Sequence, residues 1–92
     1  MQYRTFGRLD FRPSALGFGA MRLPVQRGED GKPDFKRIDD DLATAILHRA
    51  VDGGVNYVDT AWMYHEQNSE TWLGRALQGG WRERVRLATK MP

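Results

Sequence analysis

The stretch GVNYVDTAWMY, residues 54–64, contains a short strand-like run that leads into two candidate functional side chains, Asp59 and Tyr64. A second strand-like run, residues 85–89, leads directly to Lys90. A helical segment separates the two runs, and strands joined in this way are parallel neighbours in one sheet. We therefore predict that Asp59, Tyr64 and Lys90 meet at the carboxyl edge of a parallel sheet, where α/β enzymes keep their chemistry.

These three side chains together can make one proton donor. A phenol with a reference pKa of about 10 is a poor acid at neutral pH, but an adjacent ammonium stabilises the phenolate and lowers that pKa. We predict that Lys90 activates Tyr64 and that Asp59 keeps the ammonium charged and oriented. Such a tyrosine can protonate a carbonyl oxygen while a nicotinamide delivers hydride to the carbon. Any one Asp, Tyr or Lys at a strand end is more often solvated or structural, so the surrounding sequence has to support the assignment.

The segment before this stretch is predicted to be an amphipathic helix that Asp39 or Asp40 caps, since acidic groups there bind free amides and oppose the helix dipole. Gly53 and Gly54 supply the left-handed residue that ends the helix. His48 is expected to be an exposed residue of this helix. The residues of the predicted buried face recur at helical spacing: Ala43, Ile46, Leu47, Ala50 and Val51.

A second helix is predicted after Tyr64, with Asn68 or Ser69 as its cap and Gly79 and Gly80 at its end. Its apolar stripe is interpreted as core packing rather than as a cofactor site, and it consists of Trp72, Leu73, Ala76 and Leu77. Strand and helix therefore alternate along the chain, which predicts a parallel sheet with right-handed crossovers.

The N-terminal part is predicted to form a small hairpin, residues 3–14, followed by a short glycine-spaced strand, residues 15–19. Residues 25–35 are polar and contain two glycines and a proline, which indicates a surface loop. That loop either rims a substrate cleft or is an inert insertion. The expected fold class is α/β, with a hairpin followed by strand, helix, strand, helix and strand in one partial domain, residues 1–92.

In order and in detail, these segments resemble the aldo-keto reductase family. The motifs that carry the resemblance are GVNYVDTAWMY, NSE at residues 68–70, LGRAL at residues 73–77, RVRLATK at residues 84–90 and SALGFGAMRLP at residues 14–24. The last of these looks like the family's first barrel strand. Members are (β/α)8 TIM barrels that reduce aldehydes and ketones, so the resemblance implies a small-molecule carbonyl substrate. Matched residue by residue, Asp59, Tyr64 and Lys90 occupy three places of the catalytic tetrad Asp, Tyr, Lys and His.

The resemblance also implies contacts with a nicotinamide cofactor, NADPH or alternatively NADH. The end of the first strand approaches the nicotinamide ribose in this family, which corresponds here to Gly19, Ala20 and Met21, and Asp59 also contacts the cofactor. Many members have Thr where this chain has Ala20 or Met21, so a side-chain hydrogen bond is not expected there. The phosphate and adenine sites belong to loops after the last barrel strands, and residues 1–92 give no basis for choosing between the two cofactors.

The chain length predicts a fragment. A (β/α)8 barrel takes about 250 residues, whereas this chain has 92. Met1 is followed by polar residues without a signal peptide, and Pro92 comes directly after a strand, so the truncation is expected to be C-terminal. The tetrad His would then lie beyond Pro92. In such a piece some strand residues are expected to be partly exposed, namely Leu16, Phe18, Val58 and Leu87.

His65 and Glu66 follow Tyr64, but the second His of a zinc-protease helix is missing because position 69 is Ser, so no metal site is expected. The run at residues 64–70 also resembles a bacterial subset of aldo-keto reductases. Some members of that subset carry a ferredoxin-like iron–sulfur extension at the C-terminus, which would lie beyond Pro92.

Composition argues against several other classes of protein. Hydrophobic residues make up 40% of the chain, and no apolar run approaches the roughly 20 residues that cross a bilayer, so no membrane role is expected. The net charge is +2, with 14 Lys and Arg mixed among 12 Asp and Glu, which does not define a nucleic-acid-binding patch. The absence of Cys gives no disulfide framework and agrees with a reducing, cytoplasmic location.

Two functions remain open on the sequence alone. The first is an oxidoreductase that reduces aldehydes or ketones, with Tyr64 as the acid and with Lys90 and Asp59 as its tuners. The second is a non-catalytic relative that binds a nicotinamide cofactor and regulates a partner. A His at the end of the next strand would favour catalysis, and its loss would favour binding.

Overall fold

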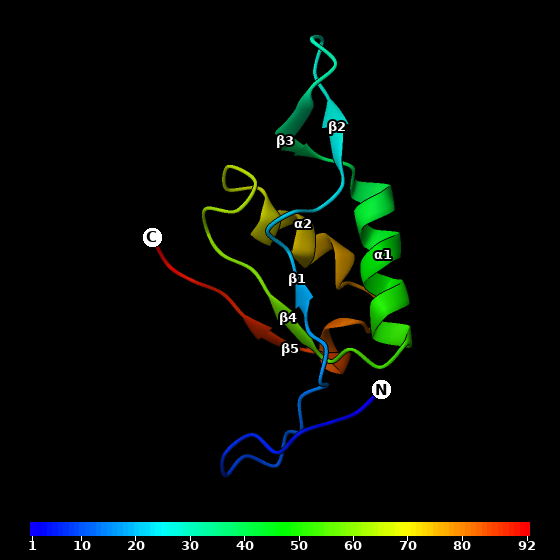
Figure 1. The fold of residues 1–92 in the computed structure, drawn as a ribbon, viewed down its shortest axis with the longest axis vertical. Helices are drawn as coiled ribbons and strands as arrows, with labels where there is room; N and C mark the ends of the chain where they lie inside the picture. The colour runs from blue at the N-terminus through cyan, green and yellow to red at the C-terminus, as the bar shows by residue number, and fades with distance from the viewer.

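A computed structural model describes residues 1–92 as a three-stranded parallel sheet with two helices packed against it, from which a two-stranded hairpin projects (Figure 1). The sheet strands are β1 (Phe18–Gly19), β4 (Tyr57–Asp59) and β5 (Arg86–Ala88), in the order β1, β4, β5. Asp59 of the central strand lies opposite Gly19 on one side and Ala88 on the other. Because both pairings are parallel, the carboxyl ends of all three strands meet at one edge.

The first helix, α1, spans Asp40–Asp52, and a side-chain oxygen of Asp39 caps it by accepting a hydrogen bond of 3.2 Å from the Leu42 amide. Gly54, with a φ of +110°, is the left-handed residue after the helix. The buried face is narrower than expected, because Ile46 remains 43% exposed. The helix residues that are buried are Ala43, Leu47 and Val51, while Ala50 is half-buried.

The second helix, α2, spans Ser69–Ala76 and buries the predicted apolar stripe, together with Leu77 just beyond its end. A short 3-10 helix, η1 (Arg82–Arg84), leads from there to β5. The expectation that His48 is exposed was wrong. The His48 ring is half-buried, stacks on Trp81 at a centroid distance of 3.8 Å, and places Nε2 at 2.7 Å from the carbonyl oxygen of Ala76. The spacing of residues within α1 could not predict this contact, because Trp81 belongs to a different segment of the chain.

The interpretation of residues 25–35 as a loop was also wrong. They belong to a hairpin of two antiparallel strands, β2 (Val25–Arg27) and β3 (Pro33–Ile38), which projects beyond α1 in Figure 1. Ile38 pairs with Val25 and is buried, so it anchors the base of the hairpin to the core. Most other side chains of the hairpin face solvent, and their polar composition concealed the pairing. The element order therefore contains an extra hairpin between β1 and α1.

Residues 3–14 pair as a minimal hairpin through two isolated bridges, Tyr3 to Ser14 and Phe6 to Leu9, rather than through continuous strands. Asn56, just before β4, attaches this segment to the sheet. Its side-chain amide donates to the carbonyl oxygen of Arg12 over 3.0 Å, and its side-chain oxygen accepts from the Ser14 amide over 2.8 Å. The N-terminal segment therefore lies at the amino end of β4, away from Asp59.

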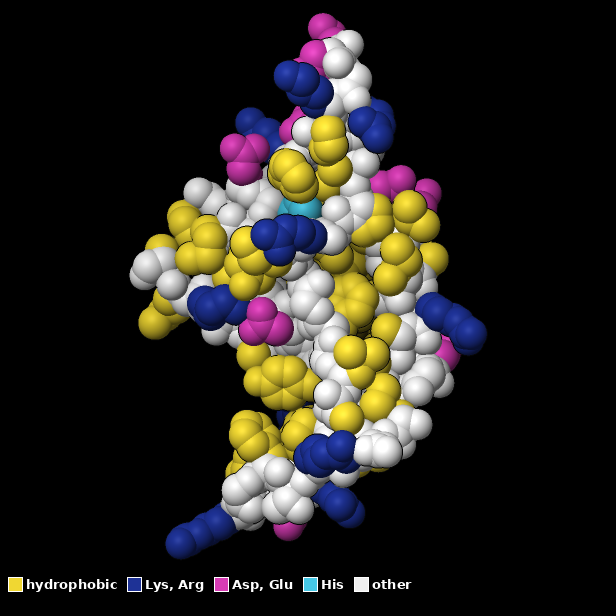
Figure 2. Space-filling view, viewed as in Figure 1, with side chains coloured by type: hydrophobic (Ala, Val, Ile, Leu, Met, Phe, Trp, Pro, Cys, Tyr) yellow, Lys and Arg dark blue, Asp and Glu magenta, His cyan; other side chains and the backbone are white.

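The core lies between the sheet and the two helices. Val58, expected to be partly exposed, is fully buried because it packs with residues of both helices, whereas Leu16 and Leu87 are 64% and 38% exposed. Figure 2 shows hydrophobic side chains at the surface over α1, where Leu42 and Ile46 are exposed, and charged side chains at the tip of the β2–β3 hairpin. Neither helix has the length and apolar character needed to span a membrane.

Candidate active site

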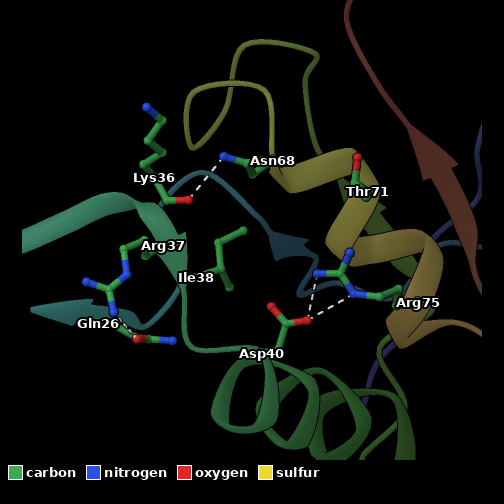
Figure 3. Close-up of a pocket in the computed structure, with 8 residues that line it drawn as sticks. All are labelled: Gln26, Lys36, Arg37, Ile38, Asp40, Asn68, Thr71 and Arg75. Carbon is green, nitrogen blue, oxygen red and sulfur yellow. Dashed lines mark hydrogen bonds and ion pairs between the residues drawn. The ribbon is translucent and has the colours of Figure 1, made fainter.

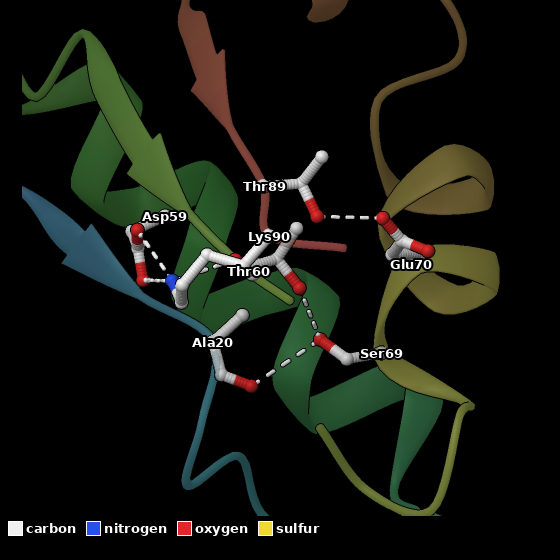
Figure 4. A network of polar contacts seen from close by, with 7 residues as sticks. All are labelled: Ala20, Asp59, Thr60, Ser69, Glu70, Thr89 and Lys90. Atoms are coloured by element: carbon white, nitrogen blue, oxygen red, sulfur yellow. Dashed lines mark hydrogen bonds and ion pairs between the residues drawn. The ribbon is translucent and has the colours of Figure 1, made fainter. Parts of the chain in front are cut away.

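Asp59 and Lys90 form an ion pair at the carboxyl edge of the sheet (Figure 4). The Nζ of Lys90 donates to both carboxylate oxygens of Asp59, each over 2.9 Å, and to the main-chain oxygen of Thr60, also over 2.9 Å. The pairing of β4 with β5 continues past the ends of the strands, because the Trp62 amide donates to the Lys90 carbonyl over 3.0 Å. This backbone contact fixes where the Lys90 side chain begins.

Tyr64 lies beside this ion pair. The Lys90 Nζ is 4.9 Å from the centroid of the Tyr64 ring, so the ammonium is within cation–π distance of this ring. The structure therefore brings together all three predicted residues. Asp59 and Lys90 are about half exposed, which leaves the group accessible to a ligand.

The pKa of Lys90 is raised above its usual value. The hydrogen bond to Asp59 is the largest cause, and the nearby Tyr64 and the negative charge of Asp59 act in the same direction. Partial burial opposes the shift but is outweighed. Lys90 therefore stays an ammonium at neutral pH, which is the charge state that the proposed chemistry needs.

A set of hydroxyl groups lies next to the ion pair and links the ends of the strands to α2. The Thr60 and Ser69 hydroxyl oxygens are 2.8 Å apart, and the Ser69 hydroxyl also donates to the carbonyl oxygen of Ala20 over 3.3 Å. Figure 4 shows these contacts joining the ends of β1 and β4 to the first turn of α2. The Thr89 hydroxyl donates to Glu70 over 2.6 Å, which joins β5 to the same turn. The network therefore fixes all three strand ends relative to α2.

Sequence reasoning missed the role of Ser69, which was considered only as a helix cap. The α2 cap position belongs to Asn68, whose side chain makes no capping hydrogen bond. The available signal was a pair of hydroxyl residues, Thr60 directly after Asp59 and Ser69 at the helix start, but nothing in their spacing predicts that they meet. Both side chains are buried, and their polar atoms are satisfied by each other.

The loop after Tyr64 has an unusual backbone. His65, Glu66 and Gln67 have φ angles of 53°, 51° and 74°, so three consecutive residues other than glycine are left-handed. Each such residue costs about 1–2 kcal/mol relative to a right-handed conformation. The Tyr64 carbonyl accepts hydrogen bonds from the amides of Gln67 and Ser69, each over 3.2 Å, which curls the loop back on itself.

A hollow of about 360 Å³ adjoins Tyr64 on the side of the β2–β3 hairpin. Its walls are mainly apolar and come from three segments: Met21 after β1, Phe35 on β3, and Met63 beside Tyr64. Arg22 and Glu66 contribute polar groups at its margin. A mainly apolar lining with a few polar groups is typical of sites that bind small molecules.

The residues matched to the cofactor site differ in accessibility. Gly19 and Met21 are exposed, and a Cβ built on Gly19 would meet no atom within 4 Å, so the surface at the end of β1 is open. Ala20 is fully buried, its amide donates to the Asp59 carbonyl over 2.9 Å, and its carbonyl accepts from Ser69. Gly19, Met21 and Asp59 can therefore contact a ligand. Ala20 lies beneath the surface and contributes through its main-chain hydrogen bonds.

A second, polar hollow of about 240 Å³ lies between the hairpin, the start of α1 and α2 (Figure 3). The Arg75 guanidinium and Asp40 close one side of it with an ion pair of 2.6 Å. On the other side the Asn68 side chain donates to the carbonyl oxygen of Lys36 over 3.0 Å. None of the residues that line this hollow belongs to the group formed by Asp59, Tyr64 and Lys90.

Comparison with known proteins identifies the family. Residues 15–92 match the model of the aldo/keto reductase family. The chain belongs to this family. It superimposes with a TM-score of 0.73 on the aldo-keto reductase AKR11C1 from Bacillus halodurans in its holo form, with 32% identity over 97% of this chain and 25% of that one. The Pseudomonas aeruginosa protein PA4992 gives a TM-score of 0.70 with 33% identity, over 95% of this chain and 30% of that one.

The thermostable aldo-keto reductase Tm1743, solved with the inhibitor epalrestat, also matches, with a TM-score of 0.70 and 29% identity over 99% of this chain. The chain spans about a quarter to a third of the length of these relatives, from 25% to 31%. Its sheet and helices therefore correspond to one part of an aldo-keto reductase barrel. Membership places the chain in a family of oxidoreductases.

Proposed function

We propose that this aldo-keto reductase segment supplies the proton donor of an enzyme that reduces aldehydes or ketones with a nicotinamide cofactor, NADPH or NADH. The observation that carries the proposal is the arrangement of Lys90, whose ammonium is held by both oxygens of Asp59 and lies over the ring of Tyr64. Three ionisable side chains from two strand ends thus converge at an accessible edge of the sheet.

The chemistry follows from these positions. The Tyr64 hydroxyl donates its proton to the carbonyl oxygen of the substrate, and the Lys90 ammonium stabilises the phenolate that remains. Asp59 keeps Lys90 charged and fixes its direction. A bound nicotinamide would supply the hydride that the carbonyl carbon receives, so the products are an alcohol and the oxidised cofactor. The surface at Gly19, beside Asp59 in the sheet, is open, which supports the proposal because it leaves room for the nicotinamide ring.

The test is Tyr64→Phe in a full-length reductase that carries this chain. The change removes the hydroxyl with little effect on packing, so kcat should fall by about 10²–10⁴-fold, the usual contribution of a general acid. Cofactor affinity, measured by fluorescence titration, should be retained because the ring stays in place.

Tyr57→Phe is the matched control, because Tyr57 is a second half-buried tyrosine of the same segment, at the opposite end of β4. It should leave kcat near the wild-type value. A Tyr64→Phe enzyme that turns over normally would overturn the proposal. Tight cofactor binding without any carbonyl reduction in the wild type would instead favour a regulatory binding protein.

A further inference from the structure

His65, the residue next to Tyr64, is buried between two segments that come before it in the chain. Its Nε2 lies 3.0 Å from the Leu23 amide nitrogen, and its Nδ1 lies 2.8 Å from the carbonyl oxygen of Phe35. Only 5% of the residue is exposed. The ring therefore bridges the segment after β1 and strand β3.

The two partners determine which nitrogen carries the proton. The Leu23 amide is a donor only, so Nε2 must accept its hydrogen bond with a lone pair. The Phe35 carbonyl is an acceptor only, so Nδ1 must carry the proton and donate it. Both contacts are satisfied only by the neutral imidazole with its hydrogen on Nδ1.

The loop that this ring holds is unfavourable by itself. Three successive left-handed residues, His65 to Gln67, persist only where neighbouring contacts hold them in place. Asn68 adds a second attachment, because its side chain donates to the carbonyl oxygen of Lys36 and to that of His65, each over 3.0 Å. Strand β3 thus holds both ends of the left-handed run, through Phe35 and Lys36.

We propose that His65 is a positioning residue for Tyr64, and that the β2–β3 hairpin belongs to the catalytic apparatus because it holds this imidazole. The inference rests on the proposed function of Tyr64. Tyr64 directly precedes the residue that Phe35 and Leu23 hold, so the path of the backbone from Asp59 to His65 determines where its ring lies relative to Lys90. Loss of the two imidazole hydrogen bonds frees that backbone and misplaces the proton donor.

The test compares His65→Leu with His65→Gln in the full-length reductase. Leucine fills much of the space but makes neither hydrogen bond, so kcat should fall by roughly tenfold or more, in line with the sensitivity of catalysis to small misplacements. Glutamine has one oxygen acceptor and one NH₂ donor and can keep both contacts, so it should restore most of the lost kcat. Rates are divided by the cofactor-binding stoichiometry, so that unfolded enzyme does not count as slow enzyme.

His48→Gln is the matched control, because His48 is a half-buried histidine that also contacts a main-chain oxygen, but it joins α1 to α2. Its kcat should stay at the wild-type value. A second measurement does not depend on the activity of any variant. Long-range proton–nitrogen NMR of the wild type should show His65 protonated on Nδ1 alone. The His65 signal is assigned by its disappearance in His65→Gln.

The outcomes separate the two proposals. If Tyr64→Phe is impaired while His65→Leu keeps the wild-type kcat, the positioning role is wrong and the proposed function stands. Equal loss in the leucine and glutamine variants, or a wild-type His65 that carries its proton on Nε2, overturns the hydrogen-bond bridge. If the wild type reduces no carbonyl, both proposals fail together.

Discussion

Lys90 is the residue on which the candidate site depends most directly. Three acceptors surround its ammonium, and the hydrogen bond to Asp59 is the main reason why the pKa of Lys90 is raised. For a lysine whose pKa is higher in the folded state, the stabilising contribution is complete below the unfolded pKa of about 10.4 and is lost as the pH rises through the folded value. Across the neutral and mildly alkaline range, neither stability nor activity should therefore change through titration of Lys90.

Replacement of Lys90 by Met tests this role, since it keeps much of the side-chain stem and removes the charge. Carbonyl reduction should fall by about 10²-fold or more, because the phenolate left by proton transfer loses its counter-charge. Asp59→Asn should weaken the enzyme in the same direction, and the alkaline limb of its kcat profile should move to lower pH, because the largest cause of the raised Lys90 pKa is gone. pH–rate profiles of both variants that coincide with the wild type would rule out the coupling.

At the scale of one element, the start of α1 makes a measurable contribution to stability. Asp39→Ala removes the oxygen that accepts the Leu42 amide proton, and loss of such a cap costs about 0.5–2 kcal/mol. Asp41→Ala is the control, because Asp41 lies exposed in the first turn and loses only its interaction with the helix dipole, about 0.3–1 kcal/mol. Denaturant unfolding of the full-length protein should show the larger loss for Asp39. If both variants lose the same free energy of unfolding, the capping hydrogen bond of Asp39 contributes no more than the interaction of a carboxylate charge with the helix dipole.

The elements that could be predicted are those whose pattern is local. The spacing of Leu47 and Val51, and of Trp72 and Leu73, indicated each buried helix face, and the structure confirms these positions. Ile46 followed the same rule but stays exposed, because the pattern cannot say how wide a stripe the neighbouring elements cover. The β2–β3 hairpin escaped prediction because pairing is a contact between segments, and solvent-facing strands lack the alternation that would reveal it.

The candidate site likewise has one part that could be predicted from the sequence and one part that could not. The approach of Asp59 to Lys90 followed from the position of each residue at the end of a parallel strand, and the structure brings them together. The burial of His65 could not be foreseen, because it depends on a carbonyl of β3 and an amide beyond β1 that no sequence motif marks. The resemblance to a family pointed to Tyr64, but only the structure shows which contacts hold the loop that follows it.

The whole molecule has few buried residues for its length. Of its 92 residues, 18 are buried. Strands β1 and β5 each have only one neighbour in the sheet, so both outer edges carry unpaired backbone groups. Large apolar side chains are also exposed, among them Leu16, Phe35 and Met91. Such a structure offers little burial to oppose the conformational entropy of the chain.

We therefore predict that residues 1–92 expressed alone neither reduce a carbonyl nor bind NADPH measurably, and that they aggregate or are loosely ordered. The partial core cannot offset an entropy cost of about 1–2 kcal/mol per ordered residue. A thermal melt and a nucleotide titration on the purified segment check this, with the full-length protein measured in parallel. A cooperative melt from a monodisperse monomer, or a micromolar affinity for NADPH, would show that the sheet and its two helices suffice as an independent domain, and that their open edges cost less than the burial of Val58, Leu47 and Trp72 contributes.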